Sequence, residues 1–251
     1  MILAEMNGDY RERVSEHMIA PTYYRSLLTP TEQDLYKMIV NCLIRFENII
    51  SVRHSVYECE AFQRVIRAVH LDHPELFYVD FWRYRLVQNI FPAVTKIEFR
   101  LLLDRITAES VTNTLSLRAA DLRKEIERKM SVEKQYYQVI NRISKTITYV
   151  DSGSAFWDHT CAAVLRGTAV CEGIAKLFLY YCQRNQLPCA VVSGTLNGSP
   201  HAWNMVETDA GIRYVDVTGL LSSASLYILH PIALFKTEVQ LHQNGYNWLV
   251  P

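Results

Sequence analysis

The stretch that decides the fold is residues 165–189, LRGTAVCEGIAKLFLYYCQRNQLPC. After Cys171, apolar side chains recur at spacings typical of one face of a helix, which predicts an amphipathic helix. The turn at residues 166–168 comes just before it, and residues 185–188 mark its end. Cys171 therefore falls in the first helical turn, whereas Cys182 falls on the buried stripe and is expected to be inert. The stripe consists of Ile174, Leu177, Phe178, Tyr181 and Cys182.

The position of Cys171 at a helix start has a chemical consequence. Unpaired backbone N–H groups at a helix N-terminus favour an anion, and so favour the thiolate, which is the nucleophilic form of cysteine. Gly173 removes a side chain next to the sulfur, which is expected to leave room for a substrate. The alternative is that Cys171 is one more packed cysteine, and position alone does not separate the two. Because a nucleophile also needs a base, the sequence that follows decides the matter.

Downstream of this helix the pattern changes to strands and tight turns. Residues 189–195, CAVVSGT, predict a short strand that closes at Gly194. An Asn197-Gly198 turn follows. Residues 201–207 and 212–217 are two further strand-compatible runs, joined by a short turn that contains aspartate and glycine. Together these two runs predict a β-hairpin.

The register of this hairpin decides whether a histidine and a carboxylate meet. With a loop of two or four residues, Asp216 lies opposite Trp203, and His201 is a diagonal neighbour of Asp216 on the same face. A three-residue loop would put them on opposite faces. In the first register, His201 takes the thiol proton, and Asp216 orients the ring and stabilises its charged form. A structural histidine and a surface acid are the alternative, but their joint arrangement is much less expected by accident.

The order of these residues resembles the core of the transglutaminase-like superfamily, in its bacterial type. The match covers about residues 131–218. The resemblance implies Cys171 as nucleophile, His201 as general base and acid, and Asp216 as the orienting carboxylate. It also implies an α+β fold, a papain-like transglutaminase core in which the nucleophile helix packs on an antiparallel sheet. The motif residues are Gly167, Cys171 and Gly173, then Gly194, then His201 to Asn204, and then Tyr214 to Thr218.

The donors that would stabilise an oxyanion are less clearly defined. The Cys171 backbone N–H is a natural donor, and members of the family add a second donor from upstream of the nucleophile. Trp157 and His159 lie in that upstream stretch, where residues 158–160 resemble a polar element of related sequences. A capping or solvated histidine is the other interpretation of His159. Trp203 is expected either to wall the cleft or to be a core aromatic residue.

The N-terminal half has a different pattern of expected secondary structure. We expect an accessory region over residues 1–130, mainly helical with a few strands, and a catalytic domain over residues 131–251. Residues 29–32, Thr-Pro-Thr-Glu, predict a helix start with a capping box. Residues 72–78 resemble a segment that precedes the core in some bacterial members. The other expected elements are a helix through 62–69, strands within 77–103, a charged helix over 108–129 and a helix from Ser131.

Composition argues against several classes of function. Lys plus Arg equals Asp plus Glu at 26 each, so neither nucleic acid nor an anionic membrane is an expected partner. No sustained apolar run predicts a membrane span; residues 219–235 come nearest, and we interpret them as buried strand and loop. No secretory signal is evident, so a cytoplasmic location is expected. The six cysteines form no C-x-x-C pair and show no zinc spacing, so no metal and no cofactor are expected.

Three kinds of function remain. The resemblance implies acyl chemistry at an amide bond of a peptide or protein substrate, through a thioester intermediate. Water as acceptor makes a peptidase or amidase, which we expect because it needs the least additional recognition; an amine as acceptor makes a transglutaminase. A non-catalytic binding or scaffold module that keeps the fold is the remaining class, and the intact Cys, His and Asp argue against it. The sequence does not indicate the substrate or the oligomeric state.

Overall fold

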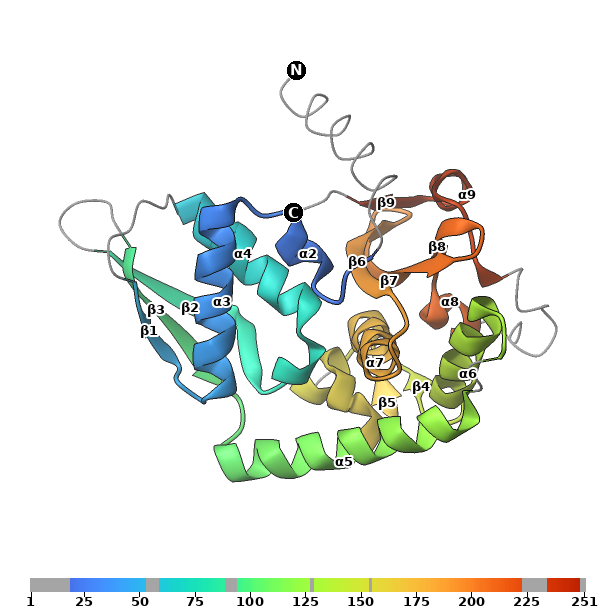
Figure 1. Ribbon diagram of the computed structural model, residues 1–251, viewed down its shortest axis with the longest axis horizontal. Coiled ribbons are helices and arrows are strands. Elements are labelled where there is room, and N and C mark those ends of the chain that lie inside the picture. Colours follow the sequence, from blue (N-terminus) through green and yellow to red (C-terminus); the bar gives the residue numbers. More distant parts are fainter. Residues whose placement is uncertain are drawn as a thin grey trace, which may run out of the picture. The chain divides into compact units, whose positions relative to one another are not determined.

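The protein divides into two compact units. The helices and strands are labelled in Figure 1. Unit 1 contains the described residues of Met1–Pro21 and of Ala119–Val250, and unit 2 contains those of Thr22–Arg118. The domain boundary expected at residue 130 stays a prediction. The structure, a computed structural model, describes residues 19–52, 59–88, 94–126, 129–153, 155–222 and 234–248.

Unit 2 combines helices with a three-stranded antiparallel sheet of order β1-β3-β2. The strands expected within 77–103 are confirmed, as is the helix expected through 62–69. The charged helix expected over 108–129 is also present, but it begins earlier and ends earlier. The elements are α2 (Tyr23–Ser26), α3 (Pro30–Ile44), β1 (Ile49–Ser51), α4 (Cys59–Asp72), the 3-10 turn η1 (Pro74–Leu76), β2 (Val79–Gln88), β3 (Val94–Leu101) and α5 (Arg105–Glu125), which continues into unit 1.

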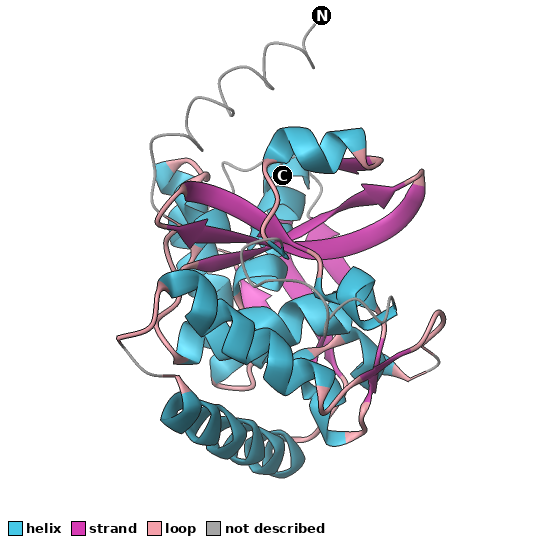
Figure 2. Ribbon diagram, turned by 90° about the vertical axis from the view of Figure 1, so that its right-hand side faces the viewer, coloured by secondary structure: helices cyan, strands magenta, loops and turns pink. Residues whose placement is uncertain are grey.

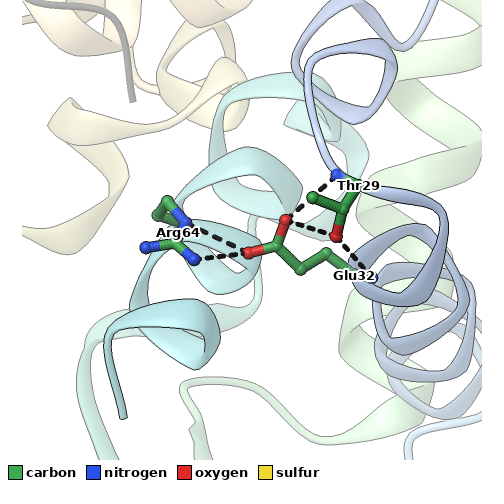
Figure 3. Close-up of polar contacts among 3 residues, drawn as sticks. All are labelled: Thr29, Glu32 and Arg64. Carbon is green, nitrogen blue, oxygen red and sulfur yellow. Dashed lines mark hydrogen bonds and ion pairs between the residues drawn. The ribbon is translucent and has the colours of Figure 1, made fainter. Parts of the chain in front are cut away.

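Helix α3 begins at the predicted capping box. The Thr29 hydroxyl accepts from the Glu32 N–H at 3.4 Å, and one Glu32 oxygen accepts from the Thr29 N–H at 3.0 Å and from its hydroxyl at 2.8 Å. Arg64 of α4 donates to the other Glu32 oxygen at 3.0 and 2.8 Å (Figure 3). Burying a carboxylate is costly unless it is paired and hydrogen-bonded. Here a carboxylate that is only 5% exposed meets both conditions and joins α3 to α4.

Unit 1 contains a four-stranded antiparallel sheet of order β8-β7-β6-β9 and a short parallel pair, β4-β5. Figure 2 shows the strands of the protein in magenta and its helices in cyan. Helix α7 packs against β6 and β7, and α6 packs against α7. The expected α+β arrangement, with the helix that begins at Cys171 packed on an antiparallel sheet, is confirmed. The elements are α6 (Val132–Ser144), β4 (Thr148–Tyr149), the 3-10 turns η2 (Phe156–His159) and η3 (Cys161–Leu165), β5 (Thr168–Ala169), α7 (Cys171–Arg184), β6 (Cys189–Leu196), β7 (Ser199–Thr208), β8 (Gly211–Val215), α8 (Val217–Ser222), α9 (Glu238–Gln243) and β9 (Tyr246–Trp248).

Two tight hairpins set the register of this sheet. Asn197 and Gly198 join β6 to β7 with φ values of 51° and 82°, the left-handed backbone that a two-residue hairpin turn requires. The β7–β8 hairpin also has a two-residue turn, because Thr208 pairs with Gly211. The same register pairs Asn204 with Val215, so Asp216 continues to a position opposite Trp203. The predicted register is therefore confirmed.

One expectation about the C-terminal part is wrong. Residues 219–222, interpreted as buried strand, belong to helix α8. The reason is local: the Asp216 carboxylate accepts from the Gly219 N–H at 3.1 Å, and a carboxylate that binds an N–H three residues later starts a helix. Residues 223–233 of the same stretch lie outside the described residues. Among the helices that the structure describes, none is long and apolar enough to cross a membrane.

Candidate active site

Cys171 is the first residue of α7, and its side chain is half-buried. The residue before it, Val170, has an extended backbone and, as a valine, no side-chain acceptor for the N–H groups of the first turn. The Val170 N–H donates to the Asp158 carbonyl at 3.1 Å, which fixes the path of the chain into the helix. The sulfur thus lies at a helix end that favours negative charge.

The role of Gly173 differs from the expectation. A Cβ at Gly173 would lie 2.1 Å from the Asp158 carbonyl oxygen and 3.3 Å from the Ala169 side chain. The missing side chain therefore makes room for the backbone of η2, which packs against α7, and not for a substrate. Close backbone approach is a usual reason for glycine inside a helix.

The imidazole of His201, on β7, reaches the carboxylate of Asp216 at the end of β8. Nε2 of His201 lies 2.8 Å from Oδ2 of Asp216. Their side chains are 11% and 8% exposed, so solvent weakens this contact little. The diagonal relation predicted from the hairpin register thus brings the two groups into direct contact.

Cys171 also acts on the His201 ring. Burial alone would lower the pKa of His201, but hydrogen bonds with Asp216 and Cys171, together with their charges, raise the pKa to about 9. Because Nε2 faces Asp216, Nδ1 is the ring nitrogen left for the sulfur. His201 thus interacts with both Cys171 and Asp216, and both interactions raise the pKa of its ring.

A tyrosine that the motif analysis missed also binds Asp216. The Tyr246 hydroxyl, on β9, donates to Oδ2 of Asp216 at 2.8 Å. Burial, and then the charge of Asp216, raises the pKa of Tyr246, so its hydroxyl stays protonated and acts as a donor. No local pattern points to this residue, because the contact spans 30 positions of sequence.

Trp203 packs against the ring of His201. It is fully buried, and its ring is stacked on that of His201 at 6.0 Å and 24°. Tyr246 and Trp248 meet it edge-on, with ring centroids 5.2 and 5.4 Å away. Trp203 is thus a core aromatic residue that backs the histidine, the second of the two expectations for it. Its indole Nε1 has no hydrogen-bond partner within the described part of the chain.

Trp157 and His159, proposed as oxyanion or cleft residues, both lie in η2. The Trp157 ring packs on Phe156 at 4.4 Å. His159 Nδ1 lies 3.2 Å from Glu172, and this hydrogen bond raises the pKa of His159 against the effect of burial. Glu172 in turn pairs with Lys176 at 3.0 Å. His159 is thus tied to a polar group beside the nucleophile, and an oxyanion role for either residue stays a prediction.

Over the residues that the structure describes, no group of three or more His, Cys, Asp or Glu side chains is arranged to hold a metal ion. The cysteines that the structure describes form no disulfide with one another.

Comparison with known proteins gives a family match. Residues 120–218 match the profile of the Transglutaminase-like superfamily. None of the curated proteins matches the chain.

Three solved structures are similar at low identity. A TGase is 16% identical with a TM-score of 0.36, and the match covers 69% of this chain and 50% of the TGase. A candidate cysteine protease from Cytophaga hutchinsonii is 14% identical with a TM-score of 0.36, over 61% of this chain and 64% of that one. A candidate protease from Parabacteroides distasonis ATCC 8503 is 10% identical with a TM-score of 0.31, over 52% and 35%. The chain thus spans about half the length of the TGase.

Proposed function

Because residues 120–218 form a transglutaminase-like superfamily core, we propose that this protein is an enzyme that uses Cys171 to cleave an amide bond of a peptide or protein. The proposed catalytic triad is Cys171, His201 and Asp216. The observation that carries the proposal is the position of His201, which contacts both the Cys171 thiol and the Asp216 carboxylate. We propose hydrolysis as the outcome, since water needs no binding site of its own.

The first half of the reaction is acylation. The Cys171 thiolate attacks the carbonyl carbon, a C–S bond forms, and the carbonyl oxygen becomes negative. We propose the Cys171 backbone N–H, in the first turn of α7, as a donor to that oxygen. His201 then gives its proton to the departing nitrogen, the C–N bond breaks, and an amine leaves behind a thioester.

The second half is deacylation. His201, now neutral, accepts a proton from water, and the resulting hydroxide attacks the thioester carbon. The C–S bond breaks, a carboxylic acid leaves, and the thiolate and the protonated ring are restored. Asp216 keeps its hydrogen bond to the ring and stabilises the charged form of the ring. A primary amine in place of water would give transfer by the same steps.

The test is the pH dependence of Cys171 alkylation, followed by peptide mass spectrometry. We expect fast labelling at Cys171 well below pH ~8.5, the ordinary thiol value, and slower labelling in His201→Ala. His70→Ala, which removes a half-buried histidine of unit 2, is the matched control and should label like the wild type. An ordinary thiol profile, identical in all three proteins, would refute a histidine-activated nucleophile.

A second measurement separates hydrolysis from transfer. Peptide substrates are incubated with the protein, with and without a primary amine, and the products are identified by mass spectrometry. Release of a free acid in the presence of the amine supports hydrolysis, whereas quantitative incorporation of the amine supports the transglutaminase reaction. Cys171→Ala should give neither product.

A further inference from the structure

The Asp216 carboxylate is shared among several donors. Within the described residues, Oδ1 accepts from the Gly219 N–H at 3.1 Å, and Oδ2 accepts from His201 and from Tyr246, each at 2.8 Å. The bond from Gly219 already fixes the orientation of the carboxylate at the start of α8. The Tyr246 hydroxyl is therefore not needed merely to hold Asp216 in place. What it adds is a second short hydrogen bond on the oxygen that faces the histidine.

Several contacts fix the Tyr246 hydroxyl at that oxygen. Strand β9 pairs antiparallel with β6, with Tyr246 opposite Leu196. The strand lies so close to β6 that a Cβ at Gly194 would be 2.1 Å from the Asn247 carbonyl oxygen. The Tyr246 ring packs edge-on against Trp203, which itself backs the His201 ring. The donor and the imidazole thus share one rigid aromatic support.

We propose that Tyr246 is a positioning residue of the catalytic site, whose hydroxyl shares Oδ2 of Asp216 with His201 and limits how firmly the carboxylate holds the proton on the ring. The proposal rests on the function proposed above. A charge-assisted hydrogen bond weakens when a second donor competes for the same oxygen. Without Tyr246, the full charge of Oδ2 would act on His201. The ring would then bind its proton more tightly and give it up less readily to a leaving amine.

The titratable groups that face this site come from four elements. Cys171 begins α7, Asp216 follows β8, Tyr246 lies on β9, and Tyr149 lies on β4, where the charges of Cys171 and Asp216 both act on it. Asp216 and Cys171 both raise the pKa of His201. A change of Tyr246 should therefore reach His201 through Asp216.

The experiment is an NMR titration of the His201 ring in the full chain, with carbon-13 in the histidines. In Tyr246→Phe we expect the midpoint of His201 to rise by on the order of half a pKa unit, about a threefold change in proton affinity. The matched control is Tyr137→Phe, which removes the hydroxyl of another half-buried tyrosine of unit 1 and should leave the midpoint unchanged. An unchanged or lowered midpoint in Tyr246→Phe would overturn the proposal.

A second variant keeps the shape of the Tyr246 side chain, and we expect it to shift the His201 midpoint in the opposite direction. With 3-fluorotyrosine at position 246 the phenol is a stronger donor, so the His201 midpoint should fall; a rise or no change would count against the proposal. Neither titration requires turnover. If alkylation of Cys171 proved independent of His201 while both midpoints moved as expected, the proposed function would fail and the coupling of Tyr246 to His201 would stand.

Discussion

The two oxygens of the Asp216 side chain have different partners. Oδ1 binds the Gly219 N–H at the start of α8, and Oδ2 faces His201. The helix start requires only an acceptor, which an asparagine also supplies. The histidine requires a negative charge, which asparagine lacks. Substitution at this position therefore separates the structural role of the residue from its chemical role.

Asp216→Asn should leave the protein folded and slow the reaction by about 10²- to 10⁴-fold, because the ring loses its charged partner and the orientation that partner imposes. The measurements are kcat/KM on a cleaved peptide and the melting temperature. Asp209→Asn, in the exposed β7–β8 turn, is the matched control and should change neither. Near-normal turnover in Asp216→Asn would remove this residue from the mechanism.

His201 should also make stability depend on pH. Its pKa is about 9 in the folded protein, above the ordinary value near 6.5. A raised folded-state pKa contributes stability that is fully present below about pH 6.5 and is lost as the pH rises through about 9. We expect the free energy of unfolding to fall across this window more steeply in the wild type than in His201→Gln. Urea unfolding at several pH values measures it, and parallel curves for the two proteins would contradict the prediction.

At the scale of elements, Gly194 lets β9 pair closely with β6. A Cβ there would lie 2.1 Å from the Asn247 carbonyl oxygen and 2.8 Å from the Trp203 ring. Gly194→Ala should therefore displace β9 and carry the Tyr246 hydroxyl away from Asp216. We expect a lower melting temperature and increased hydrogen exchange in β9. Ser193→Ala, at the neighbouring position of β6, is the control and should keep both near wild type.

The elements that could be predicted from the sequence are those whose cause is local. The capping box fixes the start of α3, the apolar stripe after Cys171 fixes α7, and the short turn before Gly211 fixes the hairpin register that joins His201 to Asp216. Periodicity and turn chemistry act over a few residues, so they can be seen in the sequence itself.

The contacts that could not be predicted depend on partners distant in the chain. β9 pairs with β6 across about fifty residues, and no periodicity specifies such a partner. The hydrogen bond between Tyr246 and Asp216 depends on that pairing, so the sequence could not predict the hydrogen bond either. Gly173 was misinterpreted for a related reason, since its neighbour is the backbone of η2.

At the scale of the whole molecule, the two compact units should differ in local stability. Glu32→Ala removes the capping box of α3 and the partner of Arg64, both inside unit 2. We expect a loss of about 1–3 kcal/mol of local stability, seen as faster hydrogen exchange in α3 and α4 and unchanged exchange in α7 and β7. Asp34→Ala, an exposed acid of the same helix, is the matched control. Equal acceleration in both units would mean that they unfold as one.

The division into units was itself outside the reach of sequence analysis. Unit 1 draws on residues before Thr22 and after Arg118, and the N–H of Ile19 donates to the Glu207 carboxylate at 3.1 Å. A boundary based on composition carries no information on such a contact between distant parts of the chain.

This interrupted order matters during synthesis on the ribosome. Ile19 is translated 188 residues before its partner Glu207, which at 5–20 residues per second is a delay of about 10–40 s. Residues Thr22–Arg118 of unit 2 are all translated within that interval, before Glu207, the partner of Ile19, has been made. Cys171 is likewise translated before His201 and Asp216. The nascent chain therefore carries the Cys171 thiol for a time without the two residues that we propose as its catalytic partners.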